Sequence, residues 1–430
     1  GSRQSRHSLK RIPSNPPVSR LVTGGATRYT LGQLSAETAR FDTPLAGTCP
    51  TPRSRALLEI DTISSENLIG SPAGTVVTDD AEIDSAEPIT KRDRDRDYLE
   101  LKRRVTQAGL LECQYLYYAW KIPSVVAMVA VSIAILVIFS STLWIQMLNA
   151  VFLALTFTNL GFLGHDSGHR QMFKKARQND WVLLGVGFLT GMTPSWWQDK
   201  HNTHHRAPNV IDVDGDIEVS LFAFSEEQAL TMRGIGRLTV RHQAFLFYPL
   251  LTLTALSLLF GGIAYQIRKE RMRYPVMEPV LVVAGLAAYL AVIFFFLGPW
   301  YGAAFIAVHR ALGGVYMGSV FAPNHKGMPM LDEDTEMDFL HQQVLTARNV
   351  QGSPLADFWY GGLNYQIEHH LFPNMPRNNL KKSQVIVRAF CEEKGIAYHH
   401  TGVWQSHKEI LGFLHDVSRP VRQKSKQISA

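Results

Sequence analysis

Long runs without a charged residue dominate the middle of the chain. From Ile122 to Gly164 no Lys, Arg, Asp or Glu occurs in 43 positions, and from Gln243 to Ile267 none occurs in 25. Between Pro279 and Asn324 the only charged residue is Arg310. A hydrocarbon core about 30 Å thick takes roughly 20 apolar helical residues to cross. The pattern therefore predicts an all-α integral membrane protein with about four transmembrane helices.

The first apolar run predicts a helical hairpin. It divides near the polar residues of Phe139–Trp144, and its return helix brings Gly164–His169 back to the side on which the chain entered. A further apolar segment, Val182–Thr193, contains three glycines and is too short to span. We expect this segment to dip into the membrane or to lie flat on it.

Three later segments are apolar, at about 243–264, 276–298 and 300–322. If all three crossed, the histidines that follow them would lie across the membrane from the earlier ones. The loop after the first segment is rich in Lys and Arg, and the positive-inside rule places it on the cytoplasmic side. The crossing pair is then 276–298 with 300–322, and 243–264, which contains Pro249, is re-entrant or lies in the membrane plane.

The flanking regions differ from this core in composition. Residues 1–97 are rich in Ser, Pro and charge and predict a disordered tail. The first 58 residues carry nine Lys or Arg against two acids, which is typical of a targeting segment, although a variable tail is the simpler alternative. A surface helix at Asp97–Glu112 leads into a membrane domain that we place at 98–415, followed by a basic tail at 416–430.

Two classes of site are excluded by composition. The three cysteines, Cys49, Cys113 and Cys391, are scattered without a C-x-x-C pair, so they predict neither a disulfide framework nor a thiolate metal site. The net charge of +6 is not gathered into a basic patch interleaved with aromatic residues, so no nucleic-acid partner is expected.

Eight of the sixteen histidines fall in four short strings, each just beyond an apolar segment. Positions i, i+3 and i+4 share one face of a helix, so each string can aim its imidazoles at one point. The sequence therefore predicts a histidine-rich metal site in a helical cap on the cytosolic side of the membrane. The strings contribute His165 and His169 (HDSGH), His201, His204 and His205 (HNTHH), His325 (PNHKG), and His369 and His370 (QIEHH).

The number of imidazoles indicates two ions. A structural zinc site closes with four ligands, so eight are too many for one ion. Imidazole suits Zn, Cu, Fe or Ni, and ligand type alone does not choose among them. Nearby acids could accept the outer N–H groups of ligand histidines: Asp166, Asp212, Asp214, Asp216 and Glu368. The isolated His242, His309 and His341 are expected to be packed or solvated.

The chain resembles the membrane fatty acid desaturase family. GHDSGH, WWQDKHNTHH and YQIEHHLFPNMPR match its three histidine boxes, H-x(3–4)-H, H-x(2–3)-H-H and [HQ]-x(2–3)-H-H, in order and spacing. The resemblance runs from about residue 110 to 410 and includes FAPNHKGMP. Glutamine at Gln366 is similar to the front-end branch, which inserts a double bond between an existing one and the carboxyl end. Related sphingolipid desaturases share that glutamine.

The resemblance implies a di-iron centre that uses O2 and two electrons to form a cis double bond in an acyl lipid or acyl-CoA. The eight histidines of the four strings would be its ligands. Gln366, Asn324 and Asp166 would be outer groups, and Trp196, Trp197 and Tyr365 would line the substrate channel. Trp196 and Trp197 fit equally well as members of an aromatic belt at the membrane interface.

The electron donor and the membrane stay open. Many front-end desaturases carry a fused cytochrome b-type haem domain with two axial histidines, whereas the first 164 residues here contain only His7. We therefore expect a separate carrier, a ferredoxin or a free cytochrome b-type protein, in a bacterial inner membrane, the endoplasmic reticulum or a plastid. Two alternatives are a fatty acyl or sphingolipid hydroxylase on the same scaffold, and a non-catalytic metal-binding membrane receptor with one closed zinc site.

Overall fold

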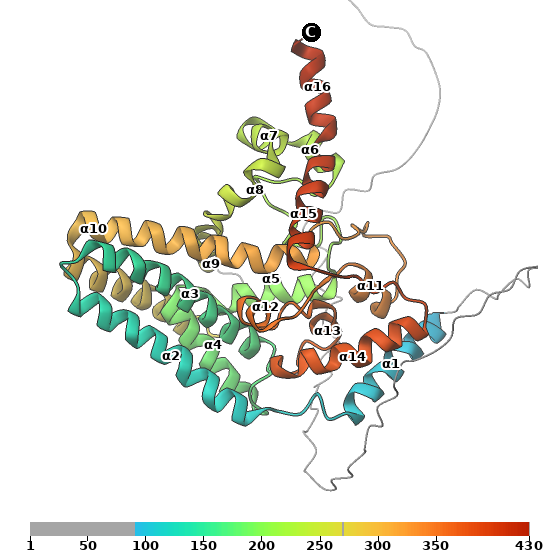
Figure 1. Cartoon of the computed structure of the whole chain (residues 1–430), viewed down its shortest axis with the longest axis horizontal. Coiled ribbons are helices and arrows are strands. Elements are labelled where there is room, and N and C mark those ends of the chain that lie inside the picture. Colours follow the sequence, from blue (N-terminus) through green and yellow to red (C-terminus); the bar gives the residue numbers. More distant parts are fainter. Residues whose placement is uncertain (1–90, 269–270, 430) are drawn as a thin grey trace, which may run out of the picture. The chain divides into compact units, whose positions relative to one another are not determined.

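A computed structural model describes residues 91–268 and 271–429, and these are almost entirely helical (Figure 1). The expected N-terminal tail and its targeting segment lie outside the described residues except at their end. There the first helix, α1 (Lys91–Gln107), begins ahead of the expected Asp97. The all-α membrane fold predicted from the charge-free runs is confirmed.

Four apolar legs form the membrane bundle. Two are α2 (Tyr115–Ile138) and α3 (Leu143–Gly168), which pack against each other as the predicted hairpin. The other two belong to α10 (Met277–His325), whose backbone leaves helical geometry at Gly298 with φ 66° and ψ −177°. Each leg of α10 has the roughly 20 residues that a crossing needs.

The two legs of α10 run antiparallel. The Tyr289 hydroxyl lies 2.6 Å from His309 Nδ1, although 20 residues separate them and a straight helix of that length measures about 30 Å. The predicted pairing of 276–298 with 300–322 is therefore confirmed as a helical hairpin. Each of the two hairpins, α2 with α3 and the two legs of α10, therefore begins and ends on the side of the histidines.

The short apolar segment forms α4 (Ala176–Thr190), which packs between α3 and α10. Its chain reverses at Gly191, which has a left-handed φ of 82°. At that end Arg310, on the second leg of α10, donates to the carbonyl of Thr190 at 3.4 Å. Because Arg310 lies about midway along its leg, α4 reaches only part of the way across, as expected of a segment that dips in.

The segment 243–264 is broken. It forms α8 (Gln243–Leu251) and α9 (Thr254–Ile267), which meet at an angle of 71° just after Pro249. The corner packs closely on α10, where a Cβ at Gly314 would lie 2.5 Å from the Leu251 carbonyl oxygen. The bend agrees with the expectation that this segment is not a straight crossing.

The remaining elements form a cap at the histidine end of the bundle (Figure 1). Its largest apolar core joins α1, α11, α13 and α14 through residues such as Leu101, Leu340, Ile367 and Phe390. The expected basic tail is helical in α16. The cap elements are α5 (Pro194–Arg206), α6 (Glu226–Thr231), α7 (Gly234–Arg241), α11 (Phe339–Leu345), α12 (Pro354–Trp359), α13 (Gln366–Leu371), α14 (Arg377–Glu393), α15 (Val403–Val417), α16 (Arg419–Ser429), and the parallel pair β1 (Asn349–Val350) and β2 (His400–Thr401).

The turn at Gly298 generates the first prediction. Its φ and ψ fall in a region that only glycine adopts without strain, so Gly298→Ala should lower the free energy of unfolding by about 1–3 kcal/mol. Gly412→Ala is the matched control, because Gly412 lies in α15 with nothing within 4 Å of an added Cβ, and should be neutral or stabilising. Thermal unfolding in detergent measures both. Equal effects of the two substitutions would contradict the hairpin geometry.

Candidate metal centre

The four histidine strings meet at one end of the membrane bundle. His165 lies in the last turn of α3 and His169 caps that helix, while His325 ends α10. The other two strings lie on α5 and on the short α13, both in the cap. All eight predicted histidines are brought together, and His165 contacts His369 although 204 residues separate them in sequence.

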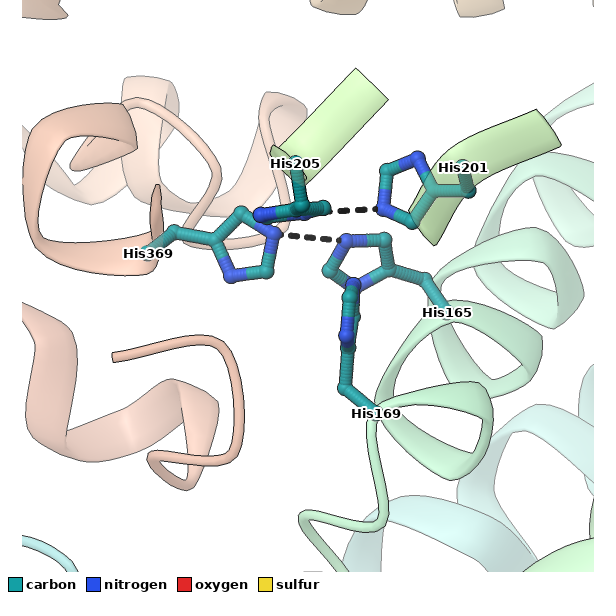
Figure 2. Close-up of side chains that lie close together, drawn as sticks. All are labelled: His165, His169, His201, His205 and His369. Atoms are coloured by element: carbon teal, nitrogen blue, oxygen red, sulfur yellow. Dashed lines mark hydrogen bonds between the residues drawn. The ribbon is translucent and has the colours of Figure 1, made fainter. Parts of the chain in front are cut away.

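Five of these histidines form one group, shown in Figure 2. Each offers a ring nitrogen, and these nitrogens all lie within 4.8 Å of one another. The Nε2 atoms of His165 and His369 are 3.0 Å apart, and those of His201 and His205 are 3.2 Å apart. We call this the five-histidine group: His165, His169, His201, His205 and His369.

The other three, His204, His325 and His370, form the three-histidine group, whose ring nitrogens also lie within 4.8 Å of one another. The Nε2 atoms of His204 and His325 are 3.3 Å apart. The two groups adjoin, since the rings of His205 and His370 stack with their centroids 4.2 Å apart. The arrangement is therefore one site with two neighbouring centres.

Burial favours the neutral form of five of these imidazoles. For His169, His201, His205, His369 and His370 the pKa lies well below its usual value, first because burial penalises the charged ring and then because neighbouring imidazoles repel a further positive charge. A neutral imidazole keeps one nitrogen lone pair, which is the form that binds a metal.

The outer nitrogens of the three-histidine group all face oxygen acceptors. His204 Nδ1 donates to the Asp214 carboxylate at 2.9 Å, His325 Nδ1 to the Thr346 carbonyl at 3.0 Å, and His370 Nδ1 to Gln343 Oε1 at 2.8 Å. A carboxylate and a carbonyl only accept, so His204 and His325 each carry a proton on Nδ1. Their Nε2 atoms are directed toward each other at 3.3 Å, as two ligands of one metal would be.

The five-histidine group has fewer outer partners. His205 Nδ1 and His369 Nδ1 are buried without a hydrogen bond, and His165 Nδ1 is 3.5 Å from Asp166 Oδ1. Asp166 instead binds the buried Arg377 guanidinium with its Oδ2, at 2.5 and 2.9 Å. Its carboxylate therefore lies beside His165 but is held mainly by α14. His169 Nε2 is also buried without a partner, as expected of an atom reserved for a metal.

Gln366 and Asn324 lie at the three-histidine group. The Gln366 amide is 3.0 Å from His325 Nε2, and Asn324 donates to Gln366 Oε1 at 3.0 Å. Asn324 Oδ1 is buried without a partner. The structure thus places two neutral amides, those of Gln366 and Asn324, beside the three-histidine group.

The three candidate channel residues lie in different surroundings. Trp197 stacks on His201 with centroids 4.5 Å apart, and Gly168 leaves room for its ring, since a Cβ there would lie 2.2 Å from Trp197 Cζ3. Trp196 contacts Gly261 of α9 instead. Tyr365 is buried in the cap core and donates to Asp357 at 2.9 Å. Only Trp197 is brought against the histidines.

Of the other acids named from the sequence, Asp216 lies near His204 and forms, with His204 and Asp214, a group that could hold a metal, whereas Asp212 and Glu368 are not brought to the histidines as outer groups. Asp212 is exposed, and Glu368 binds Asn349 and Tyr398, with burial raising its pKa to about 7. Asp216 pairs with Lys200 and lies 3.7 Å from His204 Nδ1. The three isolated histidines behave as expected: His242 is exposed, His309 bonds Tyr289, and His341 pairs with Asp338.

The sequence analysis did not identify several residues that hold the histidines, or the helix ends that carry them, in position. Arg348 is fully buried, and its guanidinium donates to the carbonyls of Pro323 at 2.7 Å and Lys326 at 2.9 Å while pairing with Glu409. It thereby binds the last-turn carbonyls of α10, on either side of His325. Arg377 could have been noticed in the MPR that follows the third box, whereas Gln343 and Arg348 stand in no motif.

Comparison with known proteins agrees with this geometry. The model of the fatty acid desaturase family matches residues 142–402, which include all four histidine strings. The chain belongs to the fatty acid desaturase family. The desaturase assignment made from the histidine boxes is thereby confirmed.

Several curated desaturases are similar to this chain. An acyl-lipid (9-3)-desaturase of Physcomitrium patens is 31% identical over 76% of this chain and 64% of its own length. A delta(6)-fatty-acid desaturase of Caenorhabditis elegans is 32% identical over 76% of each chain. A delta 8-(E)-sphingolipid desaturase of Emericella nidulans is 27% identical over 81% of this chain and 66% of its own. This chain thus spans less than two thirds of the moss and fungal relatives.

The Asp214 carboxylate generates the second prediction. Asp214→Asn removes the charged acceptor that holds His204 with its proton on Nδ1, and such outer partners are typically worth 10–100-fold in metal affinity. We expect metal retention, measured by elemental analysis after dialysis against a chelator, to fall by about that factor. Asp212→Asn is the matched control, an exposed carboxylate two residues away. Unchanged retention in Asp214→Asn would show that the hydrogen bond does not orient a ligand.

Proposed function

We propose that this chain is an O2-dependent front-end fatty acyl desaturase that introduces a cis double bond into the acyl chain of a lipid or an acyl-CoA. The observation that carries the proposal is the gathering of eight histidines, six of them buried, into two adjoining groups at the membrane boundary. Family membership supports the reaction class. The position of Gln366 at the head of the third histidine string supports the front-end type.

We assign the cofactor as two iron ions, one to each histidine group. Bound there, iron would supply the oxidising power that, with O2 and two electrons, removes two hydrogens from neighbouring methylenes. The donor set suits this assignment, because neutral imidazole is a ligand of iron and eight imidazoles exceed what one ion takes. A receptor with one closed zinc site would use four ligands and leave the remaining histidines without a role.

The protein's own residues keep the site ordered and dry. Asp214, Thr346 and Gln343 hold the ring orientations of the three-histidine group. The Gln366 amide, at the position where other branches have a ninth histidine, lies beside that group and accepts a hydrogen bond from Asn324. The Trp197 ring covers His201 and limits water access, which suits a strongly oxidising centre.

An apolar cavity in the bundle suits the acyl tail. It encloses about 200 Å³ among α2, α3, α4 and α10, on the membrane side of the histidines. Phe157 lines it and is eight residues before His165 on α3, about 12 Å along the helix. An acyl chain whose reacting carbons lie at the histidines could therefore extend its methyl end toward this cavity.

We assign electron supply to a separate carrier, a ferredoxin or a cytochrome b-type protein. Reconstitution with each carrier, reductant and O2 would identify the donor by which one supports product formation.

The central test of the function uses histidine variants in a host with a defined fatty-acid profile. The wild-type chain should form a new double bond and hold about two iron ions. His204→Ala and His369→Ala, one in each group, should abolish product, and each should retain about one iron, because each weakens one group. His242→Ala, an exposed histidine outside both groups, is the control.

The outcomes separate the candidates. Normal product from either ligand variant would remove that histidine from the site, and one zinc per chain in the wild type would favour the receptor. Mass spectrometry of the lipids distinguishes desaturation from hydroxylation, since the first removes two hydrogens and the second adds one oxygen.

The cavity generates a further prediction about chain length. Ala288 lines the cavity, and Ala288→Phe should fill part of it and reduce conversion of the longest acyl chains about tenfold relative to shorter ones, which corresponds to about 1.4 kcal/mol. Ala287→Phe is the matched control, because the neighbouring residue Ala287 does not line the cavity. Fatty-acid analysis with substrates of graded length measures the effect. The same profile in both variants would show that the cavity does not hold the acyl tail.

A further inference from the structure

An apolar strip on α7 and α8 has no partner within the described protein. Ile235 and Leu238 lie three residues apart on α7, and their side chains are 74% and 61% exposed. Phe245, at the start of α8, is 82% exposed. The opposite face of α7 packs against the rest of the protein, because Val240 is buried in one cluster with Val417 and Val421. We call the three exposed side chains the α7–α8 apolar strip.

Three arginines border this strip. Arg233 precedes α7, and Arg237 and Arg241 lie four residues apart, so they share one face of the helix. No carboxylate pairs with these guanidinium groups among the residues the structure describes. The outer surface of α7 is thus divided between large apolar side chains and unpaired positive charge, which is the pattern of a helix that lies in a membrane interface.

Contacts with α10 set the level of these helices along the bundle. The corner after α8 packs on Gly314 and Gly318, which precede the end of α10 at His325 by about 16 and 10 Å of helix. Phe247, in the middle of α8, shares a buried cluster with Ala322, only about 5 Å from that end. The helix α8 therefore extends from the level of the histidines, near Phe247, into the hydrocarbon region, at the corner that follows it.

The helix α7 directly precedes α8 and so lies at the membrane boundary. Figure 1 shows α8 leading from α9 and α10 to α7, beside α6 and α16. Farther along the same broken segment, Leu253, Phe260 and Ile267 are 45%, 62% and 74% exposed. The exposed apolar surface thus continues from the lipid-facing bundle onto α7 and α8. This continuity indicates that the covering partner is the bilayer.

We propose that α7 is an interfacial helix that binds anionic phospholipid headgroups, with Ile235, Leu238 and Phe245 in the acyl region and Arg233, Arg237 and Arg241 on the phosphates. Arginine suits this role because its planar guanidinium binds phosphate oxygens in a bidentate manner. The basic loop before α10, with Arg271 and Arg273, lies on the same side of the bundle as the histidines, which favours the cytoplasmic leaflet and its anionic lipids.

The first experiment measures immersion of the strip in the full-length protein in phosphatidylcholine–phosphatidylglycerol vesicles. A spin label is placed at Leu238→Cys or Phe245→Cys after the three native cysteines have been replaced. Phe295→Cys on a membrane leg and Lys382→Cys on the cap are the lipid and water references. Labels on the strip should collide with O2 more than with a water-soluble nickel chelate, as the Phe295 label does. Labels that behave like the Lys382 label would overturn the proposal.

The second experiment tests the headgroup. In nanodiscs of phosphatidylcholine with phosphatidylglycerol, the wild type should retain phosphatidylglycerol at least several-fold over phosphatidylcholine by native mass spectrometry, and less so at high salt. The variant Arg233→Gln/Arg237→Gln/Arg241→Gln should lose this preference. The control Lys102→Gln/Lys382→Gln/Arg388→Gln makes the same change of charge at exposed cap positions and should keep it. An equal preference for phosphatidylglycerol in both variants would overturn the assignment of the arginines. Contact of the strip with an acidic protein, rather than with lipid, would also overturn it.

Discussion

The structure depends on the convergence of buried ring nitrogens on a small volume. His204 and His325 both donate from Nδ1 to groups that can only accept, and their Nε2 atoms lie 3.3 Å apart, with the Gln366 amide 3.0 Å from His325 Nε2. Two other ring nitrogens of the site, His169 Nε2 and His370 Nε2, are buried without a partner. An unpaired buried nitrogen is costly, and a bound cation would take up the lone pairs of these atoms.

This requirement constrains the path of the chain through the membrane. The ligand strings follow different apolar segments, so each segment must return to the same rim of the bilayer. The hairpin of α2 and α3 and the hairpin turned at Gly298 of α10 each bring the chain back. The α4 helix stops partway and reverses at Gly191, and the α8–α9 pair bends by 71° instead of crossing straight. These irregular segments have a common reason: a full crossing by either one alone would separate the strings.

The sequence predicts the parts of this arrangement that depend on local pattern. Charge-free length marks the crossing legs, and the i, i+3, i+4 spacing places the imidazoles of HNTHH on one helix face. The division into groups of five and three is not local, because His204 and His205 are adjacent in sequence and belong to different groups. The supporting residues are less predictable still. Gln343 and Arg348 reach the site from the segment between α10 and α13, and only tertiary packing shows that one bonds His370 and the other holds the end of α10. Tyr365 is next to a histidine string in sequence, yet its side chain packs in the apolar core of the cap.

The two groups differ in a way that bears on their chemistry. Five imidazoles leave a metal few open positions, whereas three leave several. The three-histidine group is also the better organised one, since each outer nitrogen has an oxygen acceptor, while His205 Nδ1 and His369 Nδ1 have none. The Gln366 and Asn324 amides lie at this same group, and Asn324 Oδ1 is buried without a hydrogen-bond partner. If a metal binds there as we propose, fixed rings with exchangeable remaining positions would suit a centre that must admit a small molecule. Gln366 then lies at the group with fewer imidazoles, where a bound metal would keep more positions open.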